Sequence, residues 1–419
     1  MWWAATLNSS ETAQAHSLLT AAAVRDRAHE MLAVGMADGL EHWRVDLERL
    51  PAVATAVAAV IRDQYPGLAV PFHARWRHFS LDGVDLWGPA AEARDWLDPA
   101  SRARTEFDLA IVSVLLDAGS GPGWAYTDQR TGRTLTRSEG LAIASLRMFE
   151  AGAFSITEDD PWRVDAVALT FLTADDLARG FQVTAQNPLV GLEGRAALLR
   201  RLGQACLARP DLFALEDEPR PGGLFDAMVD RADDADRLAA PVILEVLLEA
   251  LGPVWRDRLT LDGVDLGDCW THPAIQRDDA TDGLVPIHKL SQWLSYSLVE
   301  PLQTAGVAVT DLDGLTGLAE YRNGGLFMDL GVLTLKDPAD ADRPWPVSDP
   351  LVVGWRAMTV ALLDRVAPMV RAELGVSAEQ MPLASVLEGG TWATGRRVAA
   401  ERREGGGPPL IILSDGTVF

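Results

Sequence analysis

Helical runs with clear start and stop signals follow one another along most of this 419-residue chain. The clearest begins at Asp98-Pro99, where a carboxylate suits the cap and proline suits the first turn. It ends near Asp117, before the glycine-rich breaker 119–123. Segments of this kind, joined by short turns, predict a mainly α fold with two lobes.

The other predicted helices rest on apolar spacing or on cap signals. Thr173 and Asp176 have the form of a capping box, with Asp in place of Glu. The remaining helical runs cover residues 12–36, 53–63, 138–150, 195–208, 240–256, 286–300, 311–321, 351–374 and 377–387. Together these runs leave room for only short β elements.

Short β-hairpins are predicted at two copies of Leu-Asp-Gly-Val-Asp-Leu, residues 81–86 and 261–266, because Asp-Gly between apolar residues favours a tight turn. The copies indicate either a duplicated lobe or two hairpins that arose locally, and the unmatched surroundings favour the second. Another short strand is expected at 410–413, followed by a turn at 414–416.

One stretch of the chain is unlike its neighbours. Residues 209–236 are rich in proline, glycine and acid, which is typical of a junction. We therefore predict an N-terminal helical lobe over 1–208, a junction over 209–238 and a C-terminal lobe over 239–419.

The composition excludes several classes of partner. A net charge of −23 argues against nucleic acid and against an anionic membrane surface. Residues 1–5 do not resemble a signal peptide, and no apolar run approaches membrane-spanning length. Two cysteines are too few for a disulfide framework, so a cytoplasmic protein is expected. The sequence predicts no cofactor and no particular oligomeric state.

Lysine is almost absent from the chain. Lys289 and Lys336 are the only lysines among 37 basic residues. A lysine kept against so strong a preference for arginine is a candidate for lysine chemistry, with chance as the alternative. Lys289, Gln292 and Tyr296 share one face of a predicted helix, beside an apolar stripe that starts at Leu290. Burial there would lower the pKa of the lysine, unless its ammonium reaches water.

A dense polar segment interrupts the apolar residues near position 320. Glu320, Tyr321, Arg322 and Asn323 stand in a row and are followed by Gly324-Gly325. Glycine lets the backbone approach another group closely, which suits a site. The alternative is a helix that ends in a glycine cap. We favour a functional site here.

A basic and aromatic segment precedes the first hairpin. Two histidines, His73 and His78, occur here with Trp76 and Phe79, and Trp87 follows the hairpin. On an extended strand, alternation would place His73, Arg75, Arg77 and Phe79 on one face. Such residues suit a pocket for a base or a phosphate, whereas the alternative is a hairpin with one solvated face and one buried face.

Two further segments carry weaker signals. Cys269, His272 and His288 invite a zinc interpretation, but their spacing fits no standard ligand set, and the acidic run 278–282 lacks the alternation of a calcium loop. Residues 388–397 combine a glycine-rich turn with Trp392 and Arg396, which suits an oxyanion, but they do not form a P-loop.

The chain resembles the Urg3-type uracil-catabolism family of bacteria and fungi over nearly its whole length. The resemblance is carried by residues 319–327, 388–392 and 414–419 and by the block 78–87. It implies a role in a pathway that uses uracil as a nitrogen source.

A shorter similarity suggests the chemistry. Glu320-Tyr321-Arg322, 31 positions after Lys289, is similar to the Ala-Asp-Tyr-Arg motif of the queuosine 5′-monophosphate N-ribosylhydrolases, which follows a lysine at a helix start. Those enzymes have a helical fold related to helix-hairpin-helix DNA glycosylases, and they cleave a bond between ribose C1′ and nitrogen. Glu320 replaces their catalytic Asp and is one methylene longer.

The similarity implies an N-ribosidic hydrolase that acts on a nucleoside- or nucleotide-derived molecule such as a ribosylated urea, with or without a 5′-phosphate. Glu320 and Lys289 are the predicted catalytic residues. The predicted substrate-binding residues are Arg322, Tyr321, Asn323, His78, Phe79, Trp76, Trp87, Trp392 and Arg396.

Two alternatives belong to other classes of protein. The first is a metal-dependent, amidohydrolase-like enzyme that uses Asp278, Asp279, Asp282 or His272. The second is a non-catalytic partner that binds a nucleotide intermediate. Metal content would distinguish the first alternative, and tight binding without turnover the second.

Overall fold

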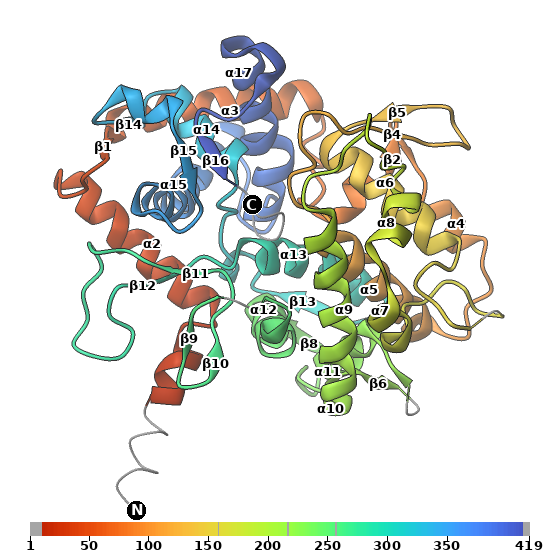
Figure 1. The fold of residues 1–419 in the computed structure, drawn as a ribbon. Coiled ribbons are helices and arrows are strands. Elements are labelled where there is room, and N and C mark those ends of the chain that lie inside the picture. The colour runs from red at the N-terminus through yellow and green to blue at the C-terminus, as the bar shows by residue number, and fades with distance from the viewer. Residues whose placement is uncertain (1–10, 158, 216–217, 256–257, 414–419) are drawn as a thin grey trace, which may run out of the picture. The chain divides into compact units, whose positions relative to one another are not determined.

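The computed structural model describes residues 11–157, 159–215, 218–255 and 258–413. These residues are mainly helical, and their strands are short and form two-stranded sheets, so the predicted fold class is confirmed (Figure 1). They group into two compact units. Unit 1 combines the described residues of 1–73, 257–292 and 311–413, and unit 2 combines those of 74–256 and 293–310.

The units are assembled from segments that lie far apart in the sequence. Residues 209–238, which the sequence marks as a junction between lobes, lie inside unit 2. The chain instead passes from one unit to the other near residues 73, 257, 292 and 310. Composition signals a change of local structure, whereas units are defined by contacts between distant segments, so the two divisions differ.

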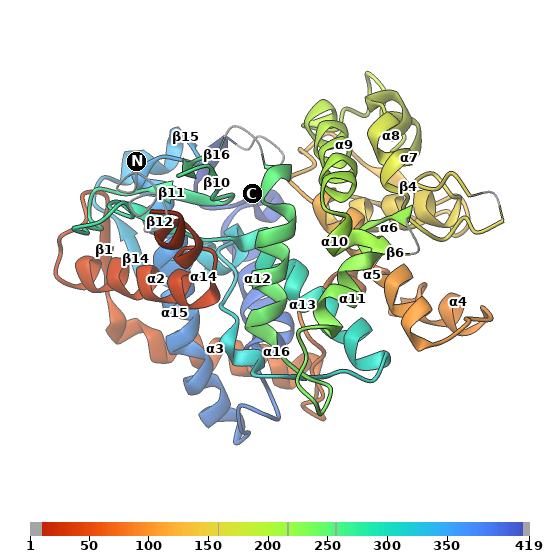
Figure 2. The ribbon, with the colours of Figure 1, turned by 90° about the horizontal axis from the view of Figure 1, so that it is seen from below.

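Unit 1 is built around a 25-residue helix, α15, Pro350–Leu374. Asp349 caps its start, Pro350 occupies the first turn, and Gly375 ends it with a φ of 70°. Helices α2 (Ala21–Met36) and α3 (Leu50–Gln64) pack against α15, as the views in Figure 1 and Figure 2 show. The buried faces of these three helices form the main core of unit 1.

The other helical elements of unit 1 are α14 (Tyr321–Asp329), α16 (Leu383–Val386), the π-helical turn η7 (Leu387–Trp392), α17 (Ala393–Arg402), and the 3₁₀ turns Leu47–Arg49, Leu312–Gly314, Pro338–Asp342 and Glu404–Gly406. Its strands are β1 (Trp43–Val45), β9 (Thr260–Leu261), β10 (Val264–Asp265), β11 (Cys269–Thr271), β12 (Leu284–Pro286), β14 (Leu333–Leu335), β15 (Pro344–Pro346) and β16 (Ile411–Leu413). Antiparallel pairs join β1 to β14, β9 to β10 and β11 to β12, while β15 and β16 are parallel.

Unit 2 packs α5 (Pro99–Leu115) against α6 (Arg137–Glu150) and α9 (Leu192–Ala208), and α9 against α7 (Ala166–Phe171) (Figure 2). Its other helical elements are η2 (Arg75–His78), α4 (Gly88–Glu92), α8 (Ala174–Gly180), α10 (Pro210–Phe213), η3 (Pro221–Gly223), α11 (Leu224–Val229), α12 (Ala240–Leu251) and η4 (Gly252–Val254). Helix α13 (Lys289–Thr304) starts in unit 1 and continues in unit 2.

The strands of unit 2 also occur in pairs. They are β2 (Ser80–Leu81), β3 (Val84–Asp85), β4 (Tyr126–Thr127), β5 (Thr134–Leu135), β6 (Ala214–Leu215), β7 (Glu218–Pro219), β8 (Arg237–Ala239) and β13 (Ala308–Thr310). Only the β8–β13 pair is parallel among these.

Both hairpins predicted from Asp-Gly are present. β2 pairs with β3, and β9 pairs with β10, in matching antiparallel registers. The turn residues Asp82 and Gly83 have φ values of 51° and 80°, and Asp262 and Gly263 have 47° and 77°. Two successive residues with positive φ define the turn that twists correctly into a hairpin, which is why Asp-Gly marks it.

Most predicted helices are found within a few residues of their expected ends. Asp98 caps its helix and Thr173 forms a capping box, both as predicted, and Asp98 also forms a capping box with Ser101. The helix expected over 311–321 is wrong, because that segment holds a 3₁₀ turn and then extended chain, and α14 begins where the prediction ended. The strand expected at 410–413 is β16, while residues 1–5 and the predicted turn at 414–416 lie outside the described residues.

Candidate active site

Glu320 caps the start of α14. Its Oε2 accepts a hydrogen bond from the N–H of Arg322 at 2.7 Å, and its Oε1 accepts one from the N–H of Asn323 at 2.6 Å. A carboxylate at this position satisfies amides that no helical carbonyl can reach, and it lies at the positive end of the helix dipole. The polar segment therefore starts a helix, and its carboxylate is held in one orientation.

The two glycines after Glu320 lie inside α14 and are buried. A Cβ on Gly324 would meet Cε2 of Trp355 in α15 at 2.7 Å, and one on Gly325 would meet Cδ of Pro409 at 3.2 Å. Gly324 allows α14 to approach α15 closely, and Gly325 lies against Pro409. Because both glycines lie inside α14, the alternative of a glycine cap at a helix end is wrong.

Lys289 is the first residue of α13. Its backbone N–H donates to Oδ2 of Asp268 at 2.9 Å, and the N–H groups of Ile287 and His288 donate to the Asp268 carbonyl. His288 has a φ of 48°, which turns the chain into the helix. The predicted apolar stripe that begins at Leu290 is buried. Asp268 thus fixes the backbone from which the Lys289 side chain projects.

Asp268 forms a buried ion pair with Arg356 of α15. The guanidinium meets the two carboxylate oxygens at 2.8 and 2.9 Å, and the indole N–H of Trp270 donates to the same carboxylate at 2.6 Å. Burial alone would raise the pKa of Asp268, but Arg356 and the hydrogen bonds lower that pKa to about 2. Nε of Arg356 also lies 3.4 Å from the carbonyl of Ala319, the residue before Glu320. A single ion pair therefore contacts the starts of both α13 and α14.

Burial dominates the electrostatics of Glu320. It raises the pKa of this carboxyl above its usual value, while the two capping amides and the charges of Lys289 and His73 oppose that rise. Lys289 and His73 therefore both act electrostatically on Glu320. A carboxylate of this kind, nearly dry and ringed by positive charge and N–H donors, is typical of a catalytic group.

His73 and Glu388 belong to candidate segments of the sequence, 73–79 and 388–397, but they are not among the predicted catalytic or substrate-binding residues. Nδ1 of His73 lies 2.6 Å from Oε2 of Glu388, and the His73 backbone N–H donates to the carbonyl of Ala384. Both side chains are mostly buried. Glu388 lies in the π-helical turn η7, a type of turn that occurs often at functional sites. We use the name Glu320 site for Glu320, Lys289, His73 and Glu388, all of which belong to unit 1.

The glycine-rich segment 388–397 is helical rather than a loop. η7 continues directly into α17. A Cβ on Gly389 or Gly390 would lie 2.7 Å from Val70 or 2.8 Å from Val57, so these glycines allow close packing. The segment is therefore not the predicted turn, and its binding of an oxyanion stays a prediction.

Of the predicted binding residues near this segment, Trp392 lies 5.9 Å from the His73 ring between centroids. The guanidinium of Arg396 stacks over Trp392 at 5.5 Å. These two side chains thus extend from η7 and α17 at the edge of the Glu320 site.

Arg322, Tyr321 and Asn323 hold α14 in place. Nη1 of Arg322 donates to the carbonyl of Gly406 at 2.6 Å, and its guanidinium lies 4.8 Å from the Tyr321 ring centre. Nδ2 of Asn323 donates to the carbonyl of Leu318, while its buried Oδ1 has no hydrogen-bond partner among the described residues. Arg322 is thus engaged within the protein, and its role in substrate binding stays a prediction.

The aromatic residues predicted for a pocket belong to unit 2. Residues 75–78 form the 3₁₀ turn η2, so the alternating strand is wrong. Trp76 packs on Phe79 and Trp87, with ring centroids 5.7 and 6.2 Å away, and His78 packs against Trp293 at 5.6 Å. These rings form an aromatic layer within unit 2, which also agrees with the alternative of a buried face.

The residues of the zinc and metal hypotheses are engaged separately. Nδ1 of His272 accepts the N–H of Ala274, and burial lowers the pKa of His272 to about 4. Asp279 accepts hydrogen bonds from Thr281, and Asp282 accepts one from Arg277. No group of three or more His, Cys, Asp or Glu side chains that could hold a metal ion occurs in the described part of the chain.

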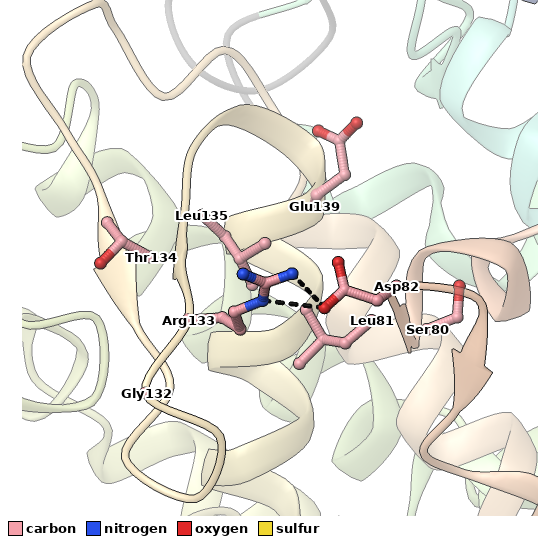
Figure 3. Close-up of a pocket in the computed structure, with 8 residues that line it drawn as sticks. All are labelled: Ser80, Leu81, Asp82, Gly132, Arg133, Thr134, Leu135 and Glu139. Carbon is pink, nitrogen blue, oxygen red and sulfur yellow. Dashed lines mark hydrogen bonds and ion pairs between the residues drawn. The ribbon is translucent and has the colours of Figure 1, made fainter.

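Two shallow hollows of about 400 Å³ are lined by residues other than those of the Glu320 site. One, in unit 2, lies beside the hairpins β2–β3 and β4–β5, and the exposed ion pair of Arg133 and Asp82 spans it (Figure 3). The other surrounds the acidic loop 273–283 in unit 1. Both are open and polar, and neither shows a convergence of catalytic groups.

None of the helices described is long and apolar enough to span a membrane.

Comparison with known proteins gives a family and two relatives. Residues 17–419 match the model of a family described as "Protein of unknown function (DUF1688)". "Protein urg3" of Schizosaccharomyces pombe is 40% identical over 410 residues, which cover 96% of this chain and 98% of that protein. "Uracil catabolism protein 4" of Lachancea kluyveri is 36% identical over 414 residues, which cover 90% and 92% of the two chains.

Proposed function

The chain belongs to the DUF1688 family, and from this membership and the geometry of the Glu320 site we propose that it hydrolyses an N-ribosidic bond in uracil catabolism. The name of the relative from Lachancea kluyveri supports the pathway. The proposed substrate class agrees with the chemistry of the pathway, because a ribosylated pyrimidine whose ring is opened and whose three carbons C4 to C6 are removed leaves a ribosylated urea. Cleavage of its N-ribosidic bond frees urea.

The observation that carries this proposal is the buried carboxylate of Glu320, fixed by two amides and acted on by Lys289 and His73. Departure of the nitrogen builds positive charge on the ribose ring. A fixed carboxylate in a site of low dielectric stabilises that charge without reorganisation, and it can accept a proton from the attacking water. Glycosidases use carboxylates in the same way.

Lys289 has a separate role in this proposal. Burial raises the pKa of Glu320, and the positive charge of Lys289 opposes that rise and so favours the ionised carboxylate. Its backbone N–H is anchored by Asp268, which fixes the point from which the side chain starts.

The test is hydrolysis of N-ribosylurea, with and without a 5′-phosphate, measured as release of ribose or ribose 5-phosphate. Glu320→Gln and Lys289→Met are each expected to lower kcat by about 10³-fold, the range of a lost charge-stabilising group. The matched control is Lys336→Met, since Lys336 pairs at the surface with Asp38 and is far from this chemistry. Its activity should equal that of the unmodified protein.

Glu320→Gln keeps one accepting oxygen for the helix cap, so the fold should survive, as checked by thermal unfolding. Unchanged turnover in both site variants would refute the assignment of the residues. Absence of turnover with every ribosylated probe, together with tight binding of one of them, would instead point to a non-catalytic binding protein.

A further inference from the structure

The contact between His73 and Glu388 is the strongest feature of the Glu320 site that the proposed roles of Glu320 and Lys289 leave unused. Nδ1 of the imidazole and Oε2 of the carboxylate are 2.6 Å apart. His73 is 5% exposed, so this is a built contact and not a surface pair. The two residues are 315 positions apart in the sequence, so folding brings them together.

The backbone of His73 is anchored by its N–H, which donates to Ala384 at 2.9 Å. Glu388 lies one turn further along the same segment, in η7. Gly389 and Gly390 press this turn against α3 and the chain before His73, where an added Cβ would collide. The imidazole and its carboxylate are therefore held as one rigid pair.

The segment that carries Glu388 packs against α14. Helix α14 packs against both η7 and α17, and a Cβ on Gly395 would collide with the carbonyl of Arg322. Electrostatic interaction between His73 and Glu320 agrees with this packing. The imidazole thus acts on the same site as the carboxylate that caps α14.

We propose that His73, oriented by Glu388, is the proton donor to the departing nitrogen of the N-ribosidic bond. This inference rests on the proposed hydrolase function. A carboxylate that accepts a hydrogen bond from Nδ1 fixes the tautomer and the ring orientation, so that Nε2 carries the transferable proton in the imidazolium form. Urea is a poor leaving group when it leaves as an anion, which is why the reaction requires a donor.

The step balances as follows. The C1′–N bond breaks, and its electron pair goes to the nitrogen, which takes the proton from His73. Water forms the new C1′–O bond and gives a proton to Glu320. Transfer of that proton back to His73 restores both groups, and the products are ribose and urea, with no other reactant consumed.

The test compares two leaving groups. N-ribosylurea requires protonation of its nitrogen, whereas 4-nitrophenyl β-D-ribofuranoside releases a stable phenolate that needs no proton. His73→Gln should lower kcat/KM for N-ribosylurea by about 10²–10⁴-fold, the usual contribution of a general acid, and lower that for the nitrophenyl riboside by less than about 10-fold. Glu320→Gln should lower both.

Glu388→Gln gives a second measure, because its amide oxygen still accepts from Nδ1 while the charge is lost. It should show the same selectivity for the leaving group with a smaller loss. The matched control is His29→Gln, which removes a His–carboxylate contact of 2.9 Å to Asp364 elsewhere in unit 1. That variant should be unchanged with both probes.

Each outcome separates the two proposals. Equal losses with both leaving groups in His73→Gln, or no loss with N-ribosylurea, would overturn the donor role while the hydrolase function stands. A selective loss in His73→Gln with full activity in Glu320→Gln would overturn the role of Glu320 and support the donor. If the unmodified protein cleaves neither probe, with or without a 5′-phosphate, the hydrolase function is overturned, and the donor role with it.

Discussion

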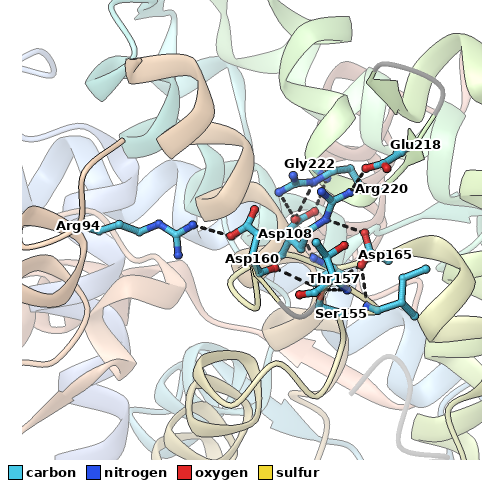
Figure 4. A network of polar contacts seen from close by, with 12 residues as sticks. Arg94, Asp108, Ser155, Thr157, Asp160, Asp165, Glu218, Arg220 and Gly222 are labelled. Carbon is cyan, nitrogen blue, oxygen red and sulfur yellow. Dashed lines mark hydrogen bonds and ion pairs between the residues drawn. The ribbon is translucent and has the colours of Figure 1, made fainter. Parts of the chain in front are cut away.

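Each unit holds a buried Asp–Arg pair, and the two pairs are tuned in opposite directions. In unit 1, Arg356 contacts both oxygens of Asp268, and the pKa of Asp268 falls to about 2. In unit 2, Arg220 places Nε and Nη2 on one oxygen of Asp108, and burial raises the pKa of Asp108 (Figure 4). Both pairs are almost fully removed from water.

Local geometry explains the difference. The Asp268 carboxylate lies at the N-terminus of α13, where the helix dipole favours negative charge, and it has a two-pronged arginine. Asp108 lies in the middle of α5, without that help. Its other hydrogen bonds come from the N–H groups of Val164 and Gly222. Asp268 orients the start of a helix that carries a candidate catalytic lysine, whereas Asp108 ties two loops to a helix.

The largest expected effect comes from removing each carboxylate. Asp268→Asn leaves Arg356 buried and unpaired, and it should lower the free energy of unfolding by about 3–5 kcal/mol. It should also lower kcat for N-ribosylurea by about 10²-fold beyond the loss of folded protein, because Lys289 shifts. Asp108→Asn should cost less stability and leave kcat unchanged.

Urea unfolding and turnover, both measured well below the melting temperature, check this pair of variants. Arg356→Lys keeps the positive charge but loses the two parallel hydrogen bonds to Asp268. It should therefore lose less stability than Asp268→Asn but almost as much turnover. A loss of kcat in Asp108→Asn equal to that in Asp268→Asn would remove the distinction between the two pairs.

A smaller effect is expected in the acid limb of stability. The depressed pKa of Asp268 contributes about 2 kcal/mol that is fully present above the unfolded value of 3.8 and is lost as pH falls through about 2. The raised pKa of Asp108 has the opposite sign, since its contribution is present below pH 3.8 and is lost as pH rises through the folded value.

Unfolding free energies of the two Asn variants between pH 2 and 6 test these signs. The difference between the unmodified protein and Asp268→Asn should grow with rising pH over the range of about 2–4. For Asp108→Asn the difference should shrink with rising pH. Parallel curves for the two variants would contradict the contrast.

The smallest effect is expected at the exposed pair of Arg133 and Asp82 (Figure 3). Both side chains are more than half exposed, so water and salt screen their attraction. Asp82→Asn also keeps a residue that tolerates the positive φ of the hairpin turn. The variant should change the free energy of unfolding by less than about 1 kcal/mol, and less still in high salt, as measured by urea unfolding.

Local signals predicted much of the fold. Asp98 and Thr173 indicated the starts of their helices because a capping hydrogen bond spans only three residues. Asp-Gly indicated both hairpins because the turn fixes the register of the two strands. The helix predicted over 311–321 was wrong because the same apolar spacing also occurs in a buried extended chain, such as Leu315 to Ala319. Segments of the two units alternate along the sequence. This alternation depends on contacts between distant residues, which no local sequence pattern indicates.

Local sequence predicted some residues of the candidate site and not others. Glu320 stood out because a row of polar residues makes a poor core, and Lys289 stood out because lysine is so rare here. The partnership of His73 with Glu388, and of Asp268 with Arg356, joins residues whose neighbours give no sign of each other. Alternation is the only pattern in the short segment from Arg75 to His78, and it predicts a strand. Tertiary packing instead makes these residues a 3₁₀ turn.

The close approach of Gly324 to Trp355 has a consequence for how this site can change over evolutionary time. Even the smallest added side chain would displace the indole or lift the helix that Glu320 caps, so this helix has no room to drift. Under the proposed function, new substrate preferences would have to arise from η7 and the outer turns of α17, which carry Trp392 and Arg396. The proposed catalytic carboxylate and these two side chains would then be free to evolve at different rates.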